Sequence, residues 1–327
     1  MSAPSPTDLH VYRVGLRTRF RGLTSRDGML VRGTAGWGEF APFWDYDDAA
    51  ALAWWRSALE AADEGWPEPV RPSVPVNVTV PAVDAGTAHT LVTGSGGCRT
   101  AKVKVAEAGQ DLAEEIARLE AVRDALGPGG AIRIDVNGRW DVATALARLP
   151  VLDRAAGGLE YVEQPCATVP ELAAVRRASD VPVAADESVR RAQDPLAVAR
   201  AGAADVLVLK VAPLGGVRAC LELAEQAGLP VVVSSALESS VGLAAGLALA
   251  GALPELPYAC GLATAQLMLD DVVADPPDVT DGELPVPSGP VAPAEDLLAR
   301  HVADPELDRR WRTRLDRVVA LAAQEDR

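Results

Sequence analysis

The sequence predicts an α/β protein: a (β/α)8-type barrel, of the TIM kind, with an α+β capping domain. From about residue 76, short apolar runs alternate with stretches rich in Ala, Leu, Arg and Glu, a pattern typical of βαβ units around a parallel sheet. The flanking segments differ in composition, because the first is rich in Trp and the last is rich in Pro. Three parts are therefore expected, at 1–73, 74–265 and 266–327, and a chain of 327 residues is long enough for them.

The first and last parts are predicted to form the capping domain together. The elements expected in the first part are a hairpin from 9–16 and 28–33, a turn at 36–42 and a helix near 47–63. Prolines then interrupt the chain between residues 67 and 75. The last part is proline-rich over 275–293 and ends in a charged helix at 305–324, which is expected to pack back on the first part.

The barrel is predicted from eight apolar runs within residues 74–265. The candidate strands are 76–80, 102–105, 131–136, 159–162, 181–185, 206–211, 230–234 and, more weakly, 258–262. The helices between them are expected at 111–126, 142–149, 169–178, 195–201, 217–227 and 242–252. Eight units favour a closed barrel over a doubly wound open sheet, and no Gly-x-Gly-x-x-Gly follows the first strand.

Lysine is rare in this chain, and it lies in unusual places. Of 31 basic residues only Lys102, Lys104 and Lys210 are lysines, and all three stand within apolar, β-branched runs. Lysine is normally exposed, and unlike arginine it can release its proton once burial lowers its pKa. The three are therefore candidates for acid–base chemistry. The alternative for Lys102 or Lys104 is a side chain that extends its amine from a strand end to solvent.

Ionisable residues recur at the ends of five consecutive candidate strands. They are Lys104, Asp135, Glu163, Asp186 and Lys210, and their separations of 31, 28, 23 and 24 residues each correspond to one barrel unit. Catalytic groups of such barrels come from the carboxyl ends of the strands. A single aspartate at a strand end often only caps the next helix. Five such residues in register predict a shared site.

The carboxylates of Asp135, Glu163 and Asp186 are predicted to bind a divalent cation. Three acids at one rim repel one another and raise one another's pKa unless a cation lies between them. Oxygen ligands without cysteine or histidine suit Mg²⁺, with Mn²⁺ as a substitute. Lys104 and Lys210 would flank this metal, where a lowered pKa makes a lysine a general base.

Strand alternation adds candidate substrate contacts, because side chains two residues apart share a face. Lys102 therefore lies on the same face as Lys104. Arg133 and Asn137 share the face of Asp135. Arg133 is either a ligand for a substrate carboxylate, an aid in orienting the lysines, or part of a structural ion pair inside the barrel.

These motifs resemble the successive strand motifs of the enolase superfamily, and in particular of its muconate-lactonising branch. They are Lys-Val-Lys at 102–104, Ile-Asp-Val-Asn at 134–137, Tyr-Val-Glu-Gln-Pro at 161–165, Ala-Asp-Glu-Ser at 185–188 and Leu-Lys-Val at 209–211. Gly-Trp-Gly-Glu-Phe-Ala-Pro at 36–42 resembles the capping-domain motif of that branch. The resemblance covers about residues 10–270 and implies a lysine base that works with Mg²⁺. No histidine stands at a strand end, so the His–Asp dyad of the mandelate-racemase branch is not matched.

Within the branch, the seventh run at 234–242 and the compact length resemble o-succinylbenzoate synthases. The resemblance implies syn dehydration of 2-succinyl-6-hydroxy-2,4-cyclohexadiene-1-carboxylate to 2-succinylbenzoate in menaquinone biosynthesis. Lys104 would remove the proton next to the carboxylate, Mg²⁺ would stabilise the enediolate, and Lys210 would act from the opposite face. The resemblance makes Ser234, Ser239 and Ser240 candidates for binding the succinyl tail.

Other functions remain open at this point. An N-acylamino acid racemase or a dipeptide epimerase would use the same two lysines. A metal-free aldolase would form a Schiff base on Lys210. A non-catalytic barrel is the third alternative, and the presence of both lysines argues against it.

Composition narrows the class of partner and compartment. A net charge of −15 argues against nucleic acid and anionic membrane as partners. No apolar run reaches the roughly 20 residues that span a bilayer, and residues 1–8 do not resemble a signal peptide. The four cysteines form no CxxC pair, which favours free thiols. We expect a cytoplasmic enzyme acting on a small-molecule carboxylate, with its oligomeric state open.

Overall fold

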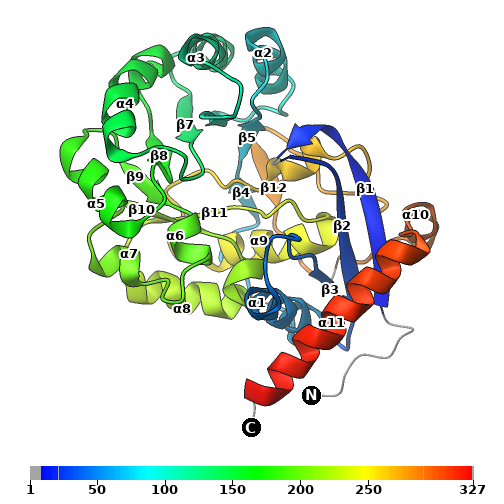
Figure 1. Cartoon of the computed structure of the whole chain (residues 1–327). Coiled ribbons are helices and arrows are strands. Elements are labelled where there is room, and N and C mark those ends of the chain that lie inside the picture. Colours follow the sequence, from blue (N-terminus) through cyan, green and yellow to red (C-terminus); the bar gives the residue numbers. More distant parts are fainter. Residues whose placement is uncertain (1–8, 21, 290, 326–327) are drawn as a thin grey trace.

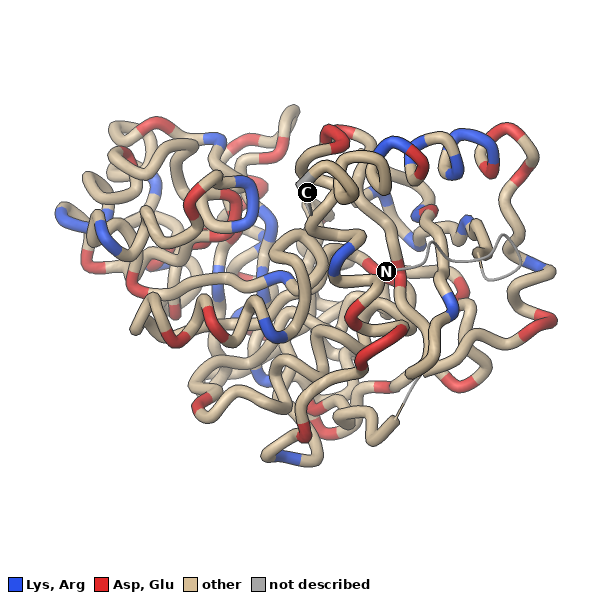
Figure 2. Tube along the Cα trace, turned by 90° about the horizontal axis from the view of Figure 1, so that it is seen from below, with Lys and Arg blue, Asp and Glu red and all other residues tan. Residues whose placement is uncertain are grey.

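A computed structural model describes residues 9–20, 22–289 and 291–325 of the chain. The prediction about a signal peptide concerns residues 1–8, which lie outside the described residues, as do 21, 290, 326 and 327. No helix within the described ranges is long and apolar enough to cross a membrane. Figure 2 shows acidic and basic residues interspersed along the chain.

A parallel sheet of seven strands forms the centre of the molecule and curls round on itself (Figure 1). Its strands, in sequence order, are β5 (Asn77–Val80), β6 (Thr100–Lys104), β7 (Ala131–Asp135), β8 (Tyr161–Glu163), β9 (Val183–Ala185), β10 (Val206–Leu209) and β11 (Val231–Val233). Strands that are consecutive in the sequence are neighbours in the sheet. These seven lie where the apolar runs predicted them, although several are shorter than the runs.

The eighth predicted strand, at 258–262, is wrong as a strand, because only single bridges form there. Cys260 bridges to Val76 and Gly261 bridges to Ser234. The N–H of Cys260 donates to the carbonyl of Pro75 at 2.7 Å, and that of Gly261 donates to the carbonyl of Val233 at 2.8 Å. This segment therefore hydrogen-bonds to both sides of the curled sheet before a 3-10 turn, η4 (Ala263–Leu267), ends the extended backbone.

Helices cover the outer side of the curled sheet (Figure 1). They are α2 (Ala85–Thr93), α3 (Leu112–Leu126), α4 (Val142–Ala156), α5 (Val169–Ala178), α7 (Ala197–Arg200), α8 (Val217–Ala227) and α9 (Ser240–Ala252), with a 3-10 turn η3 (Ala212–Leu214) before α8. The short helix α6 (Glu187–Arg190) lies instead at the strand ends, where Arg190 contacts Asp186. The helix predicted to end at 149 continues to Ala156 through Pro150. Proline removes one helical hydrogen bond, but burial of Leu149, Leu152 and Ala156 on the face toward the sheet favours continuation.

A separate antiparallel sheet packs together with helices from both ends of the chain, and this group of elements is called the capping domain below. Its elements are β1 (Leu9–Phe20), β2 (Leu23–Arg32), β3 (Trp37–Phe40), α1 (Asp48–Leu59) with a π-helical turn η2 (Glu60–Glu64), α10 (Glu295–Arg300) and α11 (Pro305–Glu325). The segment predicted as a turn at 36–42 contains β3. Helix α11 lies against α1 and β1 (Figure 1), and its buried Trp311 donates to the carboxylate of Asp27 at 2.8 Å.

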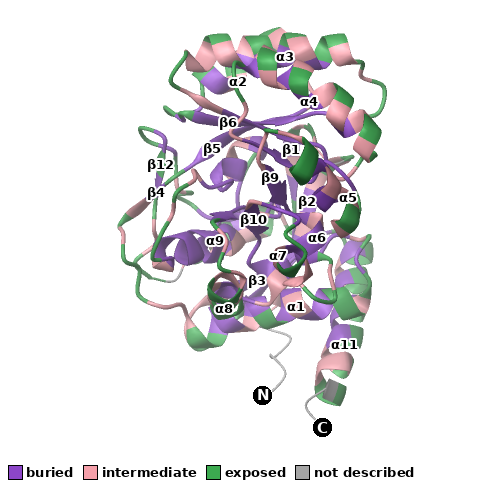
Figure 3. Ribbon diagram, turned by 90° about the vertical axis from the view of Figure 1, so that its left-hand side faces the viewer, coloured by how far each residue is buried: buried purple, intermediate pink, exposed green. Residues whose placement is uncertain are grey.

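Two further features link the parts of the chain. Strand β4 (Ser73–Pro75) pairs with β12 (Glu283–Pro285), which the sequence did not predict. A hydrophobic cluster of the capping domain includes Ala236, Leu237 and Val241, which follow β11. Figure 3 shows the central strands as buried and the outer turns of the surrounding helices as exposed. The capping domain therefore packs against the edge of the curled sheet where β11 ends.

Candidate active site

The five predicted rim residues lie together at the carboxyl ends of neighbouring strands. They are Lys104 at the end of β6, Asp135 of β7 and Glu163 of β8, then Asp186 directly after β9 and Lys210 directly after β10. Each is at most 8% exposed. In-register pairing opposes Lys104 to Asp135 and Asp135 to Glu163. The parallel register therefore brings side chains from different repeats to one rim.

Lys104 and Lys102 contact the carboxylates of β7 and β8. The ammonium of Lys104 donates to Asp135 Oδ2 at 2.5 Å and to Asn137 Oδ1 at 2.8 Å. Its Nζ lies 5.5 Å from the ring centroid of Phe20 in the capping domain. The Nζ of Lys102 lies 3.0 Å from Glu163 and 3.3 Å from Asp135. One ammonium group thus bridges two acids that belong to adjacent strands.

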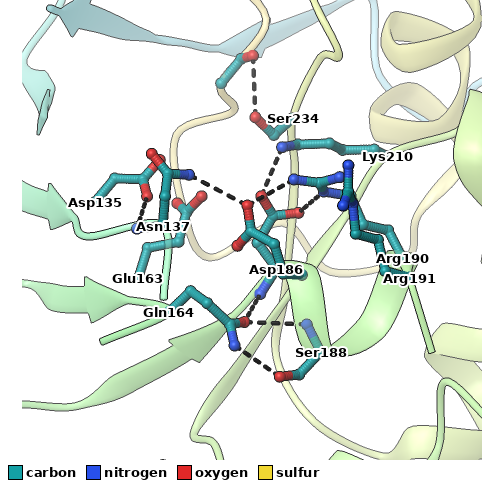
Figure 4. Close-up of polar contacts among 12 residues, drawn as sticks. Asp135, Asn137, Glu163, Gln164, Asp186, Ser188, Arg190, Arg191, Lys210 and Ser234 are labelled. Carbon is teal, nitrogen blue, oxygen red and sulfur yellow. Dashed lines mark hydrogen bonds and ion pairs between the residues drawn. The ribbon is translucent and has the colours of Figure 1, made fainter. Parts of the chain in front are cut away.

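Lys210 lies on the other side of the carboxylates and contacts Asp186. Its ammonium donates to Asp186 Oδ2 at 2.7 Å, while Asp186 Oδ1 accepts from Arg190 Nε at 2.7 Å (Figure 4). Arg190 also donates to Glu187 at 2.6 Å and to the hydroxyl of Tyr46. No role was predicted for Arg190 from the sequence. Its only signal there was its position one helical turn after Asp186.

Gln164 is a second residue that sequence reasoning missed. Its side-chain oxygen accepts from the backbone N–H groups of Asp186 and Ser188 at 3.0 and 3.1 Å, and its amide donates to the Ser188 hydroxyl at 2.6 Å (Figure 4). The side chain is fully buried. Gln164 therefore fixes the end of β9 against the end of β8, which sets the position of Asp186 relative to Glu163.

Burial and neighbouring charges shift the pKa values of these groups in different directions. Burial and the negative charge of Asp135 raise the pKa of Glu163 to about 7. Burial lowers the pKa of Lys210, although the charge of Asp186 opposes this. Burial acts the same way on Lys102, but there the attraction of Glu163 and Asp135 is stronger and the pKa is raised. Lys210 is therefore easier to deprotonate than Lys102.

The donor set of the three acids fits a hard divalent cation. Within the described ranges no three Asp, Glu, His or Cys side chains are grouped as ligands of one ion in this conformation. Two of the three acids are joined by Lys102, whose ammonium lies between Asp135 and Glu163. Because one positive group already reaches both acids, a cation at this position would reach both as well. Their carboxylate oxygens are the ligands that Mg²⁺ prefers.

A small cavity of about 30 Å³ lies beside the lysines, and only some of the predicted substrate contacts line it. Its lining includes Lys102, Lys104, Asp135, Asn137, Lys210 and Ser234, together with Phe20 and Phe43 of the capping domain. The predicted contacts at Ser239, Ser240 and Arg133 are not part of this lining.

The partners of Ser239 and Ser240 explain why the structure does not bring them into the cavity. The Ser239 hydroxyl donates to Glu39, and its N–H donates to the same carboxylate at 3.1 Å. The Ser240 hydroxyl donates to Asp271 at 2.7 Å. Both hydroxyls are buried at the start of α9, and each donates to a carboxylate.

Arg133 forms an interior ion pair, which is one of the three roles that the sequence predicted for it. Its guanidinium pairs with Glu160 at 2.5 Å and donates to the carbonyl of Ala259 at 2.7 Å. It also lies over the rings of Tyr161 and Tyr258. These partners belong to the layer of side chains below the rim, because Arg133 stands two residues before Asp135 on the same strand face.

Family models match most of the chain. The model described as enolase C-terminal domain-like matches residues 87–290, and the one described as enolase N-terminal domain-like matches residues 11–62. The o-succinylbenzoate synthase of Thermobifida fusca (strain YX) is 60% identical over 97% of this chain and 97% of its own length. That of Mycolicibacterium smegmatis is 52% identical over 96% of this chain and 95% of its own length. The chain belongs to the enolase superfamily, as its motifs predicted.

Solved structures support the same fold. Muconate lactonizing enzyme from Pseudomonas fluorescens, complexed with muconolactone, has a TM-score of 0.77 at 22% identity. The match covers 90% of this chain and 98% of that chain. A substrate-liganded L-Ala-D/L-Glu epimerase from Bacillus subtilis has a TM-score of 0.73 at 22% identity, with 88% of this chain and 98% of that chain covered. At this level of identity the likeness concerns the fold alone.

Proposed function

We propose that this protein is an o-succinylbenzoate synthase, a lyase that dehydrates 2-succinyl-6-hydroxy-2,4-cyclohexadiene-1-carboxylate to 2-succinylbenzoate in menaquinone biosynthesis. The observation that carries this proposal is the pair of buried lysines, Lys104 and Lys210, which contact different carboxylates of one rim. The relatives that are 52–60% identical over nearly the whole chain have this name. The first of these likenesses covers 97% of this chain, so it extends over both the sheet and the capping domain.

In this proposal the two lysines divide the chemistry. Lys104, as the free amine, takes the proton from the ring carbon that bears the carboxylate. The bond from the neighbouring ring carbon to its hydroxyl then breaks, and the same lysine returns the proton so that water leaves and the ring becomes aromatic. Lys210, held by Asp186 at 2.7 Å, faces the other side of the ring and donates a hydrogen bond toward the negative charge that builds up. Asn137 accepts from Lys104 at 2.8 Å and so orients its amine.

Asp135, Glu163 and Asp186 are the residues that would hold Mg²⁺, with Mn²⁺ as a substitute. The bound ion would supply positive charge next to the substrate carboxylate and so make the adjacent proton more acidic. Arg190 and Gln164 would hold Asp186 in place from behind, as groups around metal ligands commonly do. Burial of all three acids excludes water from this side of the substrate.

We also propose that residues 74–265 form a closed (β/α)8-type barrel, with 1–73 and 266–327 as the two halves of the capping domain. The hydrogen bonds of Cys260 and Gly261 to the chain on both sides of the seven-stranded sheet support the closure. The packing of α11 against α1 and β1 supports the division. In such barrels the strand ends, covered by a cap, form the active site.

The test of the proposed function is an assay with the cyclohexadiene acid. We expect an aromatic absorption band to appear with Mg²⁺, to vanish with EDTA and to return when Mg²⁺ is restored. An absent band together with racemisation of an N-succinyl amino acid would make the protein a racemase that uses the same lysines. Activity that resists EDTA, with borohydride trapping of a substrate on Lys210, would make it a Schiff-base aldolase.

A further inference from the structure

The substrate of the proposed function carries two carboxylates, and only one has a place at the rim. The ring carboxylate lies at the reacting carbon, next to the lysines. The second ends the succinyl tail, a flexible chain of four carbons. Ser239 and Ser240 are held by Glu39 and Asp271 and do not face the cavity. The following inference rests on the proposed function and concerns where the tail carboxylate binds.

The cavity beside the lysines is too small for the whole substrate, which must therefore extend beyond it. Its volume is about 30 Å³, whereas an adjoining cavity between the capping domain and the strand ends has about 690 Å³. The two share Phe20, Lys104 and Asn137 in their linings. A substrate whose ring lies beside Lys104 can therefore place its tail in the larger cavity.

Three arginines line the larger cavity, and they differ in their partners. Arg139 pairs with Glu107 at 2.9 Å, and Arg191 pairs with Asp45. Arg19 is exposed on β1 of the capping domain, and it has no carboxylate partner among the residues that the structure describes. On a chain of net charge −15, an unpaired cation facing a cavity next to the reacting lysine is well placed for an anionic ligand.

We propose that Arg19 is a specificity-determining residue that binds the carboxylate at the end of the substrate's succinyl tail. The guanidinium presents paired N–H donors that match a carboxylate. Phe20, its chain neighbour, lies over Lys104 at 5.5 Å, so binding at Arg19 orders the part of the capping domain that covers the amine. The subsite takes any ligand with a carboxylate at the far end of a short acyl chain.

Arg17 provides a competing position and a matched control. It is also an exposed arginine of β1, two residues away, but it lines a different cavity of about 580 Å³. That cavity shares only Thr79 with the one beside the lysines, whereas the cavity lined by Arg19 shares Phe20, Lys104 and Asn137 with it. The geometry therefore favours Arg19 over Arg17.

The experiment compares Arg19→Met, Arg19→Lys and Arg17→Met in full-length protein with Mg²⁺. We expect Arg19→Met to raise KM about tenfold with little change in kcat, because a contact equal in ground and transition states changes KM alone. Arg19→Lys keeps the charge and loses the paired donors, so it should lie between wild type and Arg19→Met. Arg17→Met should resemble wild type.

A binding measurement separates a carboxylate contact from a merely structural effect. The probes are 2-succinylbenzoate and 2-butyrylbenzoate, which differ only in the tail carboxylate. Wild type should prefer the first by about tenfold, and Arg19→Met should lose this preference by weakening the first ligand alone. Equal weakening of both ligands, an unchanged preference, or a loss of preference in Arg17→Met instead would overturn the inference. A wild type that binds both probes but dehydrates nothing would refute the proposed function, while the preference would still test Arg19.

Discussion

Two regions of this molecule bury carboxylates almost completely, and they use them in opposite ways. The rim site, defined as Lys102, Lys104, Lys210, Asp135, Glu163 and Asp186, has its acids paired with lysine ammonium groups. The interface cluster, defined as Glu39, Asp271, Ser239 and Ser240, has its acids paired with backbone N–H groups and hydroxyls at the start of α9. Both are at most 8% exposed.

The difference lies in the donors. A lysine amine on a flexible stem can exchange its proton and can move aside for a cation or a substrate. A backbone N–H at a helix start can do neither, and it fixes the acid that accepts from it. Burial of an acid therefore does not by itself indicate chemistry. The mobility of its hydrogen-bond donors separates the two roles, and the following predictions test that separation.

The largest effect is expected at Lys104. Lys104→Ala should lower the turnover of the cyclohexadiene acid by about 10³-fold or more, since general acid–base groups contribute up to about 10⁴-fold. Lys104→Arg is the matched variant, because it keeps a positive charge next to Asp135 but cannot act as a base. Steady-state kinetics on both variants, with circular dichroism to check the fold, would decide the role. Substantial activity in Lys104→Arg would show that charge, and not proton transfer, is needed.

The second effect concerns the metal. Asp186→Asn should raise the Mg²⁺ concentration for half-maximal activity by at least about 10-fold, because it weakens one ligand and leaves the others in place. Wild type should also unfold at a higher temperature when Mg²⁺ is added, since a ligand that binds only the folded state stabilises it. Thermal melts of both proteins against Mg²⁺ give this readout without turnover. Equal stabilisation of the variant would remove Asp186 from the ligand set.

The third effect concerns Glu39 in the interface cluster, where a substitution should change how the free energy of unfolding depends on pH. Burial raises the pKa of Glu39 from 4.5 to about 7, although the hydrogen bond from Ser239 opposes this. An acid whose pKa is higher in the folded state binds more protons when folded, so wild type should lose roughly 3 kcal/mol as the pH rises between these two values. Glu39→Gln cannot ionise at this position, so its loss should be smaller than that of wild type by roughly this amount, while the contribution of Glu163 remains in both proteins. Urea unfolding of both proteins at pH 5 and pH 8 measures the difference. If the free energy of unfolding changed equally in both proteins, Glu39 would be ionised in the folded protein over this whole range.

The smallest effect is expected at Ser240. Ser240→Ala removes a hydroxyl that donates to Asp271 at 2.7 Å, so the free energy of unfolding should fall by about 1 kcal/mol. KM should stay at the wild-type value, because the hydroxyl does not line the cavity beside the lysines. Urea unfolding and steady-state kinetics on the same preparation check both. A raised KM with unchanged stability would return Ser240 to the substrate site.

The rim residues could be predicted because their signal is local. Each of the five stands at the end of an apolar run, and register in a parallel sheet then carries all of them to one rim. Arg190 and Gln164 could not be assigned in this way, because their roles come from partners that are distant in sequence. Arg190 contacts Tyr46, which is 144 residues away.

The parts of the fold that were missed depend on weak or non-local signals. Helix α2 is short and contains Gly86 and several threonines, which lower helix propensity. Strand β4 pairs with β12 across about two hundred residues, which no local pattern indicates. The apolar run at 258–262 was strand-like in composition, but it forms only single bridges before the chain turns. The partners of Ser239 and Ser240 could not be predicted, because their pairing with Glu39 and Asp271 is a tertiary contact between segments distant in sequence.

A crystal structure with Mg²⁺ and 2-succinylbenzoate tests the central claim most directly. We expect one ion about 2.1 Å from oxygens of Asp135, Glu163 and Asp186 and from the product's ring carboxylate. The amines of Lys104 and Lys210 should lie on opposite faces of the product ring. An ion bound elsewhere, or both lysines on the same face of the ring, would contradict it.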